Sequence, residues 1–132
     1  MKKILIINSD YYKKISNNLV NEAKKKLILS KFQVSIINVP GIFEIPIAVR
    51  KNIKKFDGFV TLGCVIKGQT PHFNFICSST FDAIMMLSVN FTKPIGNGII
   101  TALNMSQAIK RSKTNTSNKT NKGSEAANAV IS

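Results

Sequence analysis

The sequence predicts a single α/β domain in which helices cover both faces of a parallel β-sheet. Four apolar runs of strand length alternate along the chain with segments whose apolar residues recur at helical spacing. Such alternation is typical of right-handed βαβ units, which build parallel sheets. A chain of 132 residues, 44% of them apolar, can bury one hydrophobic core and is too short for two. We therefore expect residues 1–132 to form one domain.

The first half of the chain contains two predicted strands, each followed by a helix. Lys3–Asn8 is an apolar run with polar ends, the pattern of a strand buried on both faces. Asp10 is a candidate N-cap for a long helix whose apolar positions recur over residues 15–28 and whose lysines face water. Gln33–Val39 is β-branched and apolar, and the Pro-Gly pair after it ends this second strand. Helical spacing resumes over Phe43–Ile53.

The helix predicted after the third strand is too apolar to be covered by one small sheet. Gly58–Ile66 is a buried strand, and the glycine-containing loop Lys67–His72 follows its carboxyl end. The next segment, Phe73–Asn90, has one charged residue and apolar residues on nearly every helical face, so it must be buried all round. Because the sheet covers only one side of it, we expect the rest to pack against another subunit. The sequence therefore predicts an oligomer.

The last third of the chain contains one more strand and two short helices. The strand Ile99–Leu103 is predicted to be entered through the loop Gly96-Asn97-Gly98, and a short helix follows over Ser106–Arg111. Ser112–Lys122 is polar and basic, which predicts a mobile linker. A final helix is predicted over Ser124–Ile131.

Composition argues against a membrane protein and against a disulfide or zinc scaffold. The apolar runs are far shorter than the roughly 20 residues of a spanning helix, and the N-terminal run ends at Asn8, too early for a signal peptide. Cys64 and Cys77 are not part of a CxxC motif, and the chain has one histidine. This pattern indicates neither a disulfide framework nor a metal site, so we expect a reducing, cytoplasmic location.

The net charge of +13 raises nucleic acid or an anionic small molecule as a partner. The charge alone does not choose between them, and lysine-rich helix faces that contact only water explain it equally well. An RNA-binding function rests on charge alone, because the sequence lacks the exposed aromatic platform that single-stranded RNA recognition usually uses. We therefore expect no nucleic-acid partner.

Three loops expected at the carboxyl edge of the sheet, where such folds bind ligands, contain the chemically unusual residues. His72, the only histidine, can exchange protons near neutral pH, although a histidine here can also be a hydrogen-bonded or surface residue. Lys67-Gly68-Gln69-Thr70 offers donors for a phosphate, or is a plain loop. Glu44 is a ligand or a favourable helix-dipole charge, and Tyr11 is a ligand or a cap on the core. No nucleotide-binding fingerprint is present.

Four segments of the chain resemble the signature segments of the lumazine synthase family: VPGIFEIP at Val39–Pro46, LGCVIKGQTPHF at Leu62–Phe73, ITALNMSQAIKRS at Ile100–Ser112 and NKGSEAA at Asn121–Ala127. The resemblance extends from about Lys3 to Ala129. It implies a flavodoxin-like, three-layer αβα sandwich around a four-stranded parallel sheet, with each active site between neighbouring subunits of a pentamer or a shell of pentamers.

The same resemblance implies the reaction. It joins 5-amino-6-(D-ribitylamino)uracil to 3,4-dihydroxy-2-butanone 4-phosphate and gives 6,7-dimethyl-8-ribityllumazine, phosphate and water, without cofactor or metal. His72 would transfer protons, Arg111 would bind the phosphate from the adjacent subunit, and Glu125 would pair with Arg111. Asn97 falls where many members place an aromatic residue over the pyrimidine. The other substrate-binding residues that the resemblance implies are Tyr11, Ile42, Phe43, Glu44, Cys64, Val65, Ile66, Gln69, Thr70 and Lys122.

A catalytically silent lumazine- or flavin-binding protein of the same fold is the alternative to an enzyme. A pure binder would keep the contacts to the ring and the ribityl chain, but it would not need a proton-transfer group and a phosphate clamp. The chain retains His72, Arg111 and Lys122, which favours the enzyme. The segment 112–121 is longer than in shell-forming members and the N-terminus lacks their extension, so we expect a homopentamer.

Overall fold

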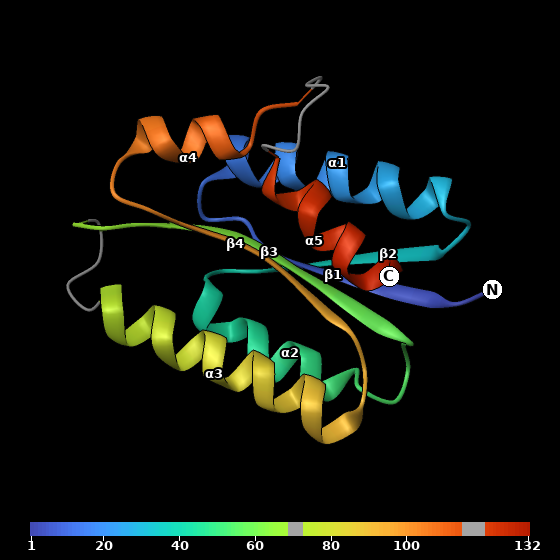
Figure 1. Cartoon of the computed structure of the whole chain (residues 1–132). Coiled ribbons are helices and arrows are strands. Elements are labelled where there is room, and N and C mark those ends of the chain that lie inside the picture. Colours follow the sequence, from blue (N-terminus) through green and yellow to red (C-terminus); the bar gives the residue numbers. More distant parts are fainter. Residues whose placement is uncertain (69–72, 115–120) are drawn as a thin grey trace.

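A four-stranded parallel sheet lies between two layers of helices in the computed structural model, which describes residues 1–68, 73–114 and 121–132 (Figure 1). The strand order is β2-β1-β3-β4, and every pair of neighbours is parallel. This arrangement confirms the predicted α/β class and the flavodoxin-like sandwich. The elements in chain order are β1 (Lys3–Ser9), α1 (Lys13–Leu29), β2 (Gln33–Val39), the 3₁₀ helix η1 (Ile42–Glu44), α2 (Ile45–Lys51), β3 (Gly58–Ile66), α3 (Phe73–Phe91), β4 (Ile95–Ala102), α4 (Met105–Arg111) and α5 (Lys122–Ile131).

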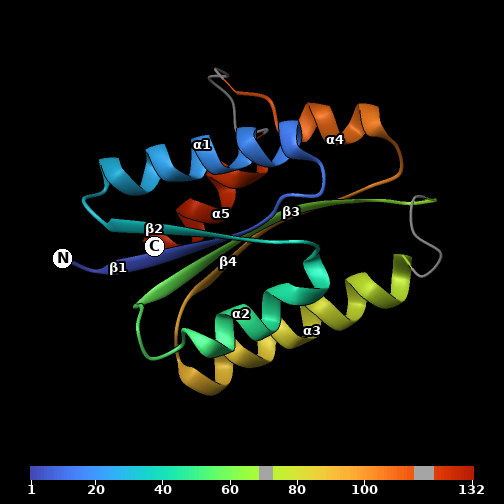
Figure 2. The ribbon, with the colours of Figure 1, turned by 180° about the vertical axis from the view of Figure 1, so that it is seen from behind.

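The sheet separates two hydrophobic cores, because successive strand side chains point to opposite faces. Ile4 and Ile6 of β1 face α1, α4 and α5, whereas Leu5 and Ile7 face α2 and α3. Figures 1 and 2 show these helix layers from opposite sides of the molecule. All nine residues of β3 are buried, and its predicted bounds are confirmed. Among the described residues, no helix is both long and apolar enough to cross a membrane.

The start of α1 differs from the prediction. Asp10 does not cap the helix, which begins at Lys13 after an N-cap residue, Tyr12, whose side chain makes no capping hydrogen bond. The backbone N–H of Asp10 instead donates to the carbonyl oxygen of Val39 (3.2 Å), so the chain still follows the edge of the sheet at this residue. The Asp10 carboxylate lies 3.4 Å from the ammonium of Lys13.

The segment Gly96-Asn97-Gly98 was expected as a loop, but it is part of β4. The two glycines are present because α5 packs directly on this strand. A Cβ on Gly96 would overlap the carbonyl oxygen of Ala126, and one on Gly98 would crowd the Ala126 side chain. Glycine here serves helix–sheet packing instead of a turn, so the prediction from composition was wrong.

Both ends of the basic segment 112–122 are anchored to the rest of the domain, so the prediction of a mobile linker over the whole segment is wrong at its ends. Ser112 and Asn121 are buried, and the Asn121 amide donates to the carbonyl oxygens of Ser112 (3.1 Å) and Lys113 (3.0 Å). The Asn121 side-chain oxygen accepts from the N–H of Ser124, so α5 begins two residues before its predicted start. Residues 115–120 lie outside the described part of the chain.

The helix α3 buries only one of its faces within the chain. Cys77, Thr80 and Ile84 are buried, whereas Met85 and Val89 are 65% and 68% exposed. The predicted burial on all sides is therefore not reached within a single chain. The predicted helix Phe43–Ile53 is divided into η1 and α2, with the proline in the first turn of α2.

Candidate functional site

Two separate pockets contain most of the predicted site residues. The first, called the strand-end pocket, has a volume of about 200 Å³ and lies where the carboxyl ends of β1 and β3 meet. The second, called the edge pocket, has a volume of about 650 Å³ and lies along the edge strand β4. The strand-end pocket is lined by Ser9, Tyr11, Tyr12, Gly41, Ile42, Phe43, Cys64, Val65, Ile66 and Ile76. The edge pocket is lined by Phe81, Asn97, Ile99, Ile100, Thr101, Gln107, Lys110, Arg111, Lys122 and Glu125.

The strand-end pocket lies at the switch point of the sheet. The chain runs from β1 outward to β2 on one side and from β3 outward to β4 on the other, and ligands of parallel sheets bind where the strand order reverses. The register between β1 and β3 ends at Asn8 and Leu62, although β3 continues to Ile66. The last residues of β3 therefore have no strand partner on the β1 side, and their backbone groups there can meet a ligand.

An aromatic pair forms one wall of the strand-end pocket. Tyr11 is 71% exposed, and its ring meets the Tyr12 ring edge to face at a centroid distance of 4.9 Å. Tyr12 is half-buried, and its pKa is raised by this burial and further by Cys64 and Tyr11. Because Tyr12 supports Tyr11 from the side, the outer face of Tyr11 is available to stack on a flat ring.

The turn after β2 forms the opposite wall. Ile42 is buried and fixes η1 to the core, whereas Phe43 is 66% exposed. Glu44 does not line the pocket, but its Oε1 folds back to within 3.2 Å of the position that a Cβ on Gly41 would take. Glu44 occupies the N-cap position of α2 without a side-chain capping bond, so its carboxylate is not used by the helix.

The floor of the pocket is apolar and uncharged. Cys64, Val65 and Ile66 are all buried at the end of β3. Burial raises the pKa of the Cys64 thiol to about 11, so this thiol is protonated at neutral pH and is a poor nucleophile. The floor can therefore contribute backbone polar groups and apolar contacts, which suits an uncharged heterocycle.

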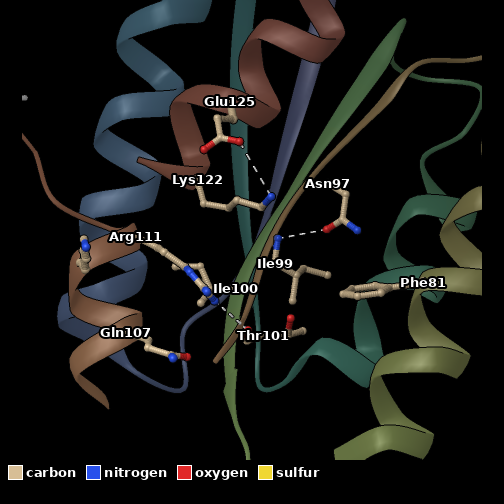
Figure 3. Close-up of a pocket in the computed structure, with 10 residues that line it drawn as sticks. Phe81, Asn97, Ile99, Ile100, Thr101, Gln107, Arg111, Lys122 and Glu125 are labelled. Atoms are coloured by element: carbon tan, nitrogen blue, oxygen red, sulfur yellow. Dashed lines mark hydrogen bonds and ion pairs between the residues drawn. The ribbon is translucent and has the colours of Figure 1, made fainter. Parts of the chain in front are cut away.

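The edge pocket, in contrast, is strongly cationic (Figure 3). Lys110, Arg111 and Lys122 line it against one carboxylate, Glu125. One guanidinium nitrogen of Arg111 donates to the carbonyl oxygen of Thr101 (2.9 Å), which orients the fork and leaves its other N–H donors for an anion. Lys122 lies 3.9 Å from Glu125. Among the described residues, Glu125 therefore forms its ion pair with Lys122, one helical turn away, and not with Arg111. The expected pairing of Glu125 with Arg111 is wrong.

The predicted site residues thus separate into two groups. Those on the strand-end pocket are Tyr11, Ile42, Phe43, Cys64, Val65 and Ile66, with Glu44 beside them. Those on the edge pocket are Asn97, Arg111 and Lys122. The predictions for Gln69, Thr70 and His72 fall outside the described residues. Among the residues that the structure describes, no group of three or more His, Cys, Asp or Glu is arranged to hold a metal ion.

Sequence reasoning missed six residues that line the edge pocket: Ile99, Ile100 and Thr101 of β4, together with Phe81, Gln107 and Lys110. Phe81 belongs to the apolar pattern of α3, which predicts only core packing. Gln107 accepts a hydrogen bond from the Leu103 backbone N–H (2.8 Å), and nothing in its sequence position signals a pocket. Lys110 precedes Arg111, and its sequence context gives the same signal as the lysines on solvated helix faces.

Comparison with known proteins independently supports the family that the four signature segments suggest. The family model described as 6,7-dimethyl-8-ribityllumazine synthase matches residues 1–132. A protein of that name from Bartonella tribocorum is 39% identical over 97% of this chain and 87% of its own length. Proteins of the same name from Corynebacterium kroppenstedtii (34% identical, 98% and 80% covered) and Campylobacter jejuni (38% identical, 98% and 85% covered) are also similar.

Proposed function

Because this chain belongs to the 6,7-dimethyl-8-ribityllumazine synthase family, we propose that it condenses 5-amino-6-(D-ribitylamino)uracil with 3,4-dihydroxy-2-butanone 4-phosphate in riboflavin biosynthesis. The observation that carries this proposal is the pair of unlike pockets. One is apolar, has an exposed aromatic face and offers free backbone groups; the other is lined by three cations and one carboxylate. The reaction needs both environments, since one substrate is a flat uncharged heterocycle and the other carries a phosphate.

The strand-end pocket is proposed to bind the pyrimidine substrate. Tyr11 would stack on the ring, and the backbone of Cys64, Val65 and Ile66 would meet its polar edge. The turn Ile42–Glu44 would hold the ribityl chain, with the Glu44 carboxylate accepting hydrogen bonds from its hydroxyl groups. This assignment is supported by the half-buried Glu44 side chain, which folds toward the pocket wall at Gly41.

The edge pocket is proposed to bind the phosphate of the four-carbon ketone. The planar fork of Arg111 suits two phosphate oxygens, and Lys122 adds a second positive charge. Gln69 and Thr70 would complete the phosphate site from the loop after β3, as the family resemblance implies. His72 would then transfer protons while the amine attacks the ketone, the imine forms and phosphate leaves, a contribution of typically about 10²–10⁴-fold.

The complete site is proposed to form between subunits of a homopentamer, with Arg111 reaching the strand-end pocket of a neighbouring chain. Two observations support an oligomer. The edge pocket is open along the unpaired edge of β4, and α3 leaves Met85, Met86 and Val89 more than half exposed. Light scattering should give a mass of about five chains, and a particle of about sixty chains would contradict the pentamer.

We also propose a cytoplasmic location. Cys64 and Cys77 are both free and buried, and they belong to the two different cores on opposite faces of the sheet. A chain with two separated free thiols suits a reducing compartment.

The decisive test is turnover. Purified protein mixed with the two substrates, without added metal or nucleotide, should give the absorbing and fluorescent lumazine. His72→Ala should slow this turnover and leave the thermal unfolding temperature nearly unchanged, because proton transfer is lost while the fold is kept. An inactive wild-type oligomer that still binds ribityl compounds would contradict the enzyme and favour the silent binder.

A further inference from the structure

The wall of the edge pocket at Asn97 differs from the aromatic wall that the family resemblance suggests. Asn97 is exposed on β4, and its side-chain oxygen accepts a hydrogen bond from the backbone N–H of Ile99 (3.0 Å). This bond decides which end of the amide faces the ligand, because the oxygen is occupied by the strand. In Figure 3 the amide nitrogen of Asn97 points toward Phe81. Asn97 therefore offers an N–H donor and no flat apolar surface.

An aromatic ring is nevertheless present beside it. Asn97, Ile99 and Thr101 lie on one face of β4, since strand residues two apart share a face. Phe81 of α3 lies against this face and lines the edge pocket. The ring is half-buried and packs on the core between the sheet and α3. One part of Phe81 is thus fixed by the core, and another part borders the pocket.

The edge pocket has a charged end and an apolar end. Arg111 and Lys122 come from α4 and α5 and lie on one side of β4, whereas Phe81 comes from α3 on the other side (Figure 3). If the phosphate binds at the charged end, the reacting carbon of the ketone extends away from it. The pyrimidine amine must reach that carbon, so the ring lies toward the apolar end.

We propose that, in the shared site, Phe81 of one subunit supplies a second aromatic wall for the pyrimidine ring that stacks on Tyr11 of the neighbouring subunit. The Asn97 amide beside Phe81 donates a hydrogen bond to a ring carbonyl. The assignment rests on the proposed function and makes Phe81 a substrate-binding residue. A uracil ring has an extended π-face and carbonyl acceptors, and this pair of side chains matches both. The aromatic contact comes from a helix on the opposite side of the sheet edge from Arg111, instead of from β4.

The test compares four variants. Phe81→Leu keeps an apolar side chain on the core and removes the π-face, whereas Phe81→Tyr keeps the face. Asn97→Asp keeps the oxygen that accepts from Ile99 and removes the N–H donor. Phe91→Ala is the matched control, since Phe91 lies on the same helix and lines neither pocket. KM is measured for each substrate with the other saturating, together with the thermal unfolding temperature.

Phe81→Leu should raise KM for the pyrimidine by roughly three- to tenfold, with KM for the phosphorylated ketone nearly unchanged. Asn97→Asp should raise the pyrimidine KM by a similar factor. Its new carboxylate lies in the same pocket as Arg111 and Lys122, so it should also raise KM for the phosphorylated ketone. Phe81→Tyr should retain the low pyrimidine KM, and Phe91→Ala should change neither KM. Unchanged pyrimidine KM in Phe81→Leu, or an equal rise of both KM values in that variant, would overturn the proposal.

A second measurement separates this inference from the proposed function. 6,7-Dimethyl-8-ribityllumazine is fluorescent, so its binding to each variant can be measured without turnover. If wild-type protein is inactive, the proposed function fails, but weaker lumazine binding by Phe81→Leu than by Phe81→Tyr still supports the aromatic wall. Equal binding by these two variants refutes it, whatever the activity.

Discussion

The replacement of Arg111 by alanine tests the phosphate site most directly. In the structure, one of the five N–H donors of the guanidinium is used by the Thr101 carbonyl oxygen at 2.9 Å. The remaining donors can form two parallel hydrogen bonds to a phosphate. Arg111 lies next to Lys110 and opposite Lys122, so the pocket remains cationic after the replacement. Arg111→Ala therefore removes the oriented N–H donors of the guanidinium, while the positive charges of Lys110 and Lys122 remain.

The expected magnitude follows from this geometry. A hydrogen bond to a charged group contributes about 1.5–3 kcal/mol. Because the pocket is open to solvent, which weakens each bond, we assign the two bonds of the fork together the contribution of one such bond. Arg111→Ala should then lower kcat/KM for the phosphorylated ketone by about 10- to 150-fold. Arg111→Lys should lie between wild type and alanine, because it keeps the charge and loses the fork.

Steady-state rates of lumazine formation, measured by absorbance while each substrate is varied in turn, give the two specificity constants. The control is Arg50→Ala, because Arg50 is the other arginine of the chain and lies on α2, where it stacks on Phe91 at 4.8 Å. Arg50→Ala should change neither constant. The reasoning is refuted if Arg111→Ala impairs the use of both substrates equally, or if Arg50→Ala has the same effect.

Three further predictions concern the fold. Gly96→Ala should lower the free energy of unfolding by about 1–3 kcal/mol, because the new methyl group would overlap the Ala126 carbonyl oxygen; an unchanged thermal unfolding temperature would contradict the close packing of α5. Burial raises the pKa of the Cys64 thiol in the folded state to about 11. Because the unfolded chain loses this proton at lower pH than the folded chain, the stabilisation is complete below about pH 9 and declines between about pH 9 and 11. Cys64→Ala should therefore flatten the plot of the urea unfolding midpoint against pH over that range. Lys93 donates from its ammonium to two backbone carbonyls of the α2–β3 loop, and Lys93→Met should cost about 1–3 kcal/mol in urea unfolding.

The fold could be predicted from the sequence where burial and local chemistry agree. The third strand, Gly58–Ile66, was predicted with its observed bounds because it is mostly apolar and ends at a glycine-containing loop. Gly96 and Gly98 were misread because composition does not tell a turn glycine from one that makes room for a helix. The atom that requires glycine at position 96 belongs to Ala126, thirty residues later, and only the tertiary structure brings the two together.

The candidate site also combines residues that the sequence predicts with residues that only the tertiary structure reveals. Residues at strand ends, such as Tyr11 and Glu44, were predicted because a parallel sheet gathers them at one edge, whereas Cys64 was implied only by the family resemblance. The pairing of Glu125 with Arg111 was taken from the family resemblance, and the local helix geometry favours another partner. Since α5 begins at Lys122, Lys122 and Glu125 are three residues apart on one helix, the spacing that favours an ion pair. Phe81 was missed because an aromatic residue within an apolar helix gives the same signal whether it faces the core or a pocket.

The proposed division of the site between subunits leads to a last prediction. Arg111 lies on the edge pocket and Tyr11 on the strand-end pocket, and the family resemblance assigns His72 to the side of Tyr11. In a shared site, a chain with Arg111→Ala still contributes an intact His72, and a chain with His72→Ala still contributes an intact Arg111. Mixed oligomers of the two therefore contain some interfaces in which both functional groups are intact.

Co-expression of Arg111→Ala and His72→Ala chains in equal amounts tests this directly. Random assembly of a cyclic oligomer places an intact His72 opposite an intact Arg111 at about a quarter of the interfaces, so the mixture should recover roughly a quarter of wild-type activity. The two variants purified separately and assayed together without subunit exchange provide the control, and they should show only the sum of their residual rates. If each site lies within one chain, no interface combines both intact groups. Co-expression would then give no more activity than the control, and the shared site would be wrong.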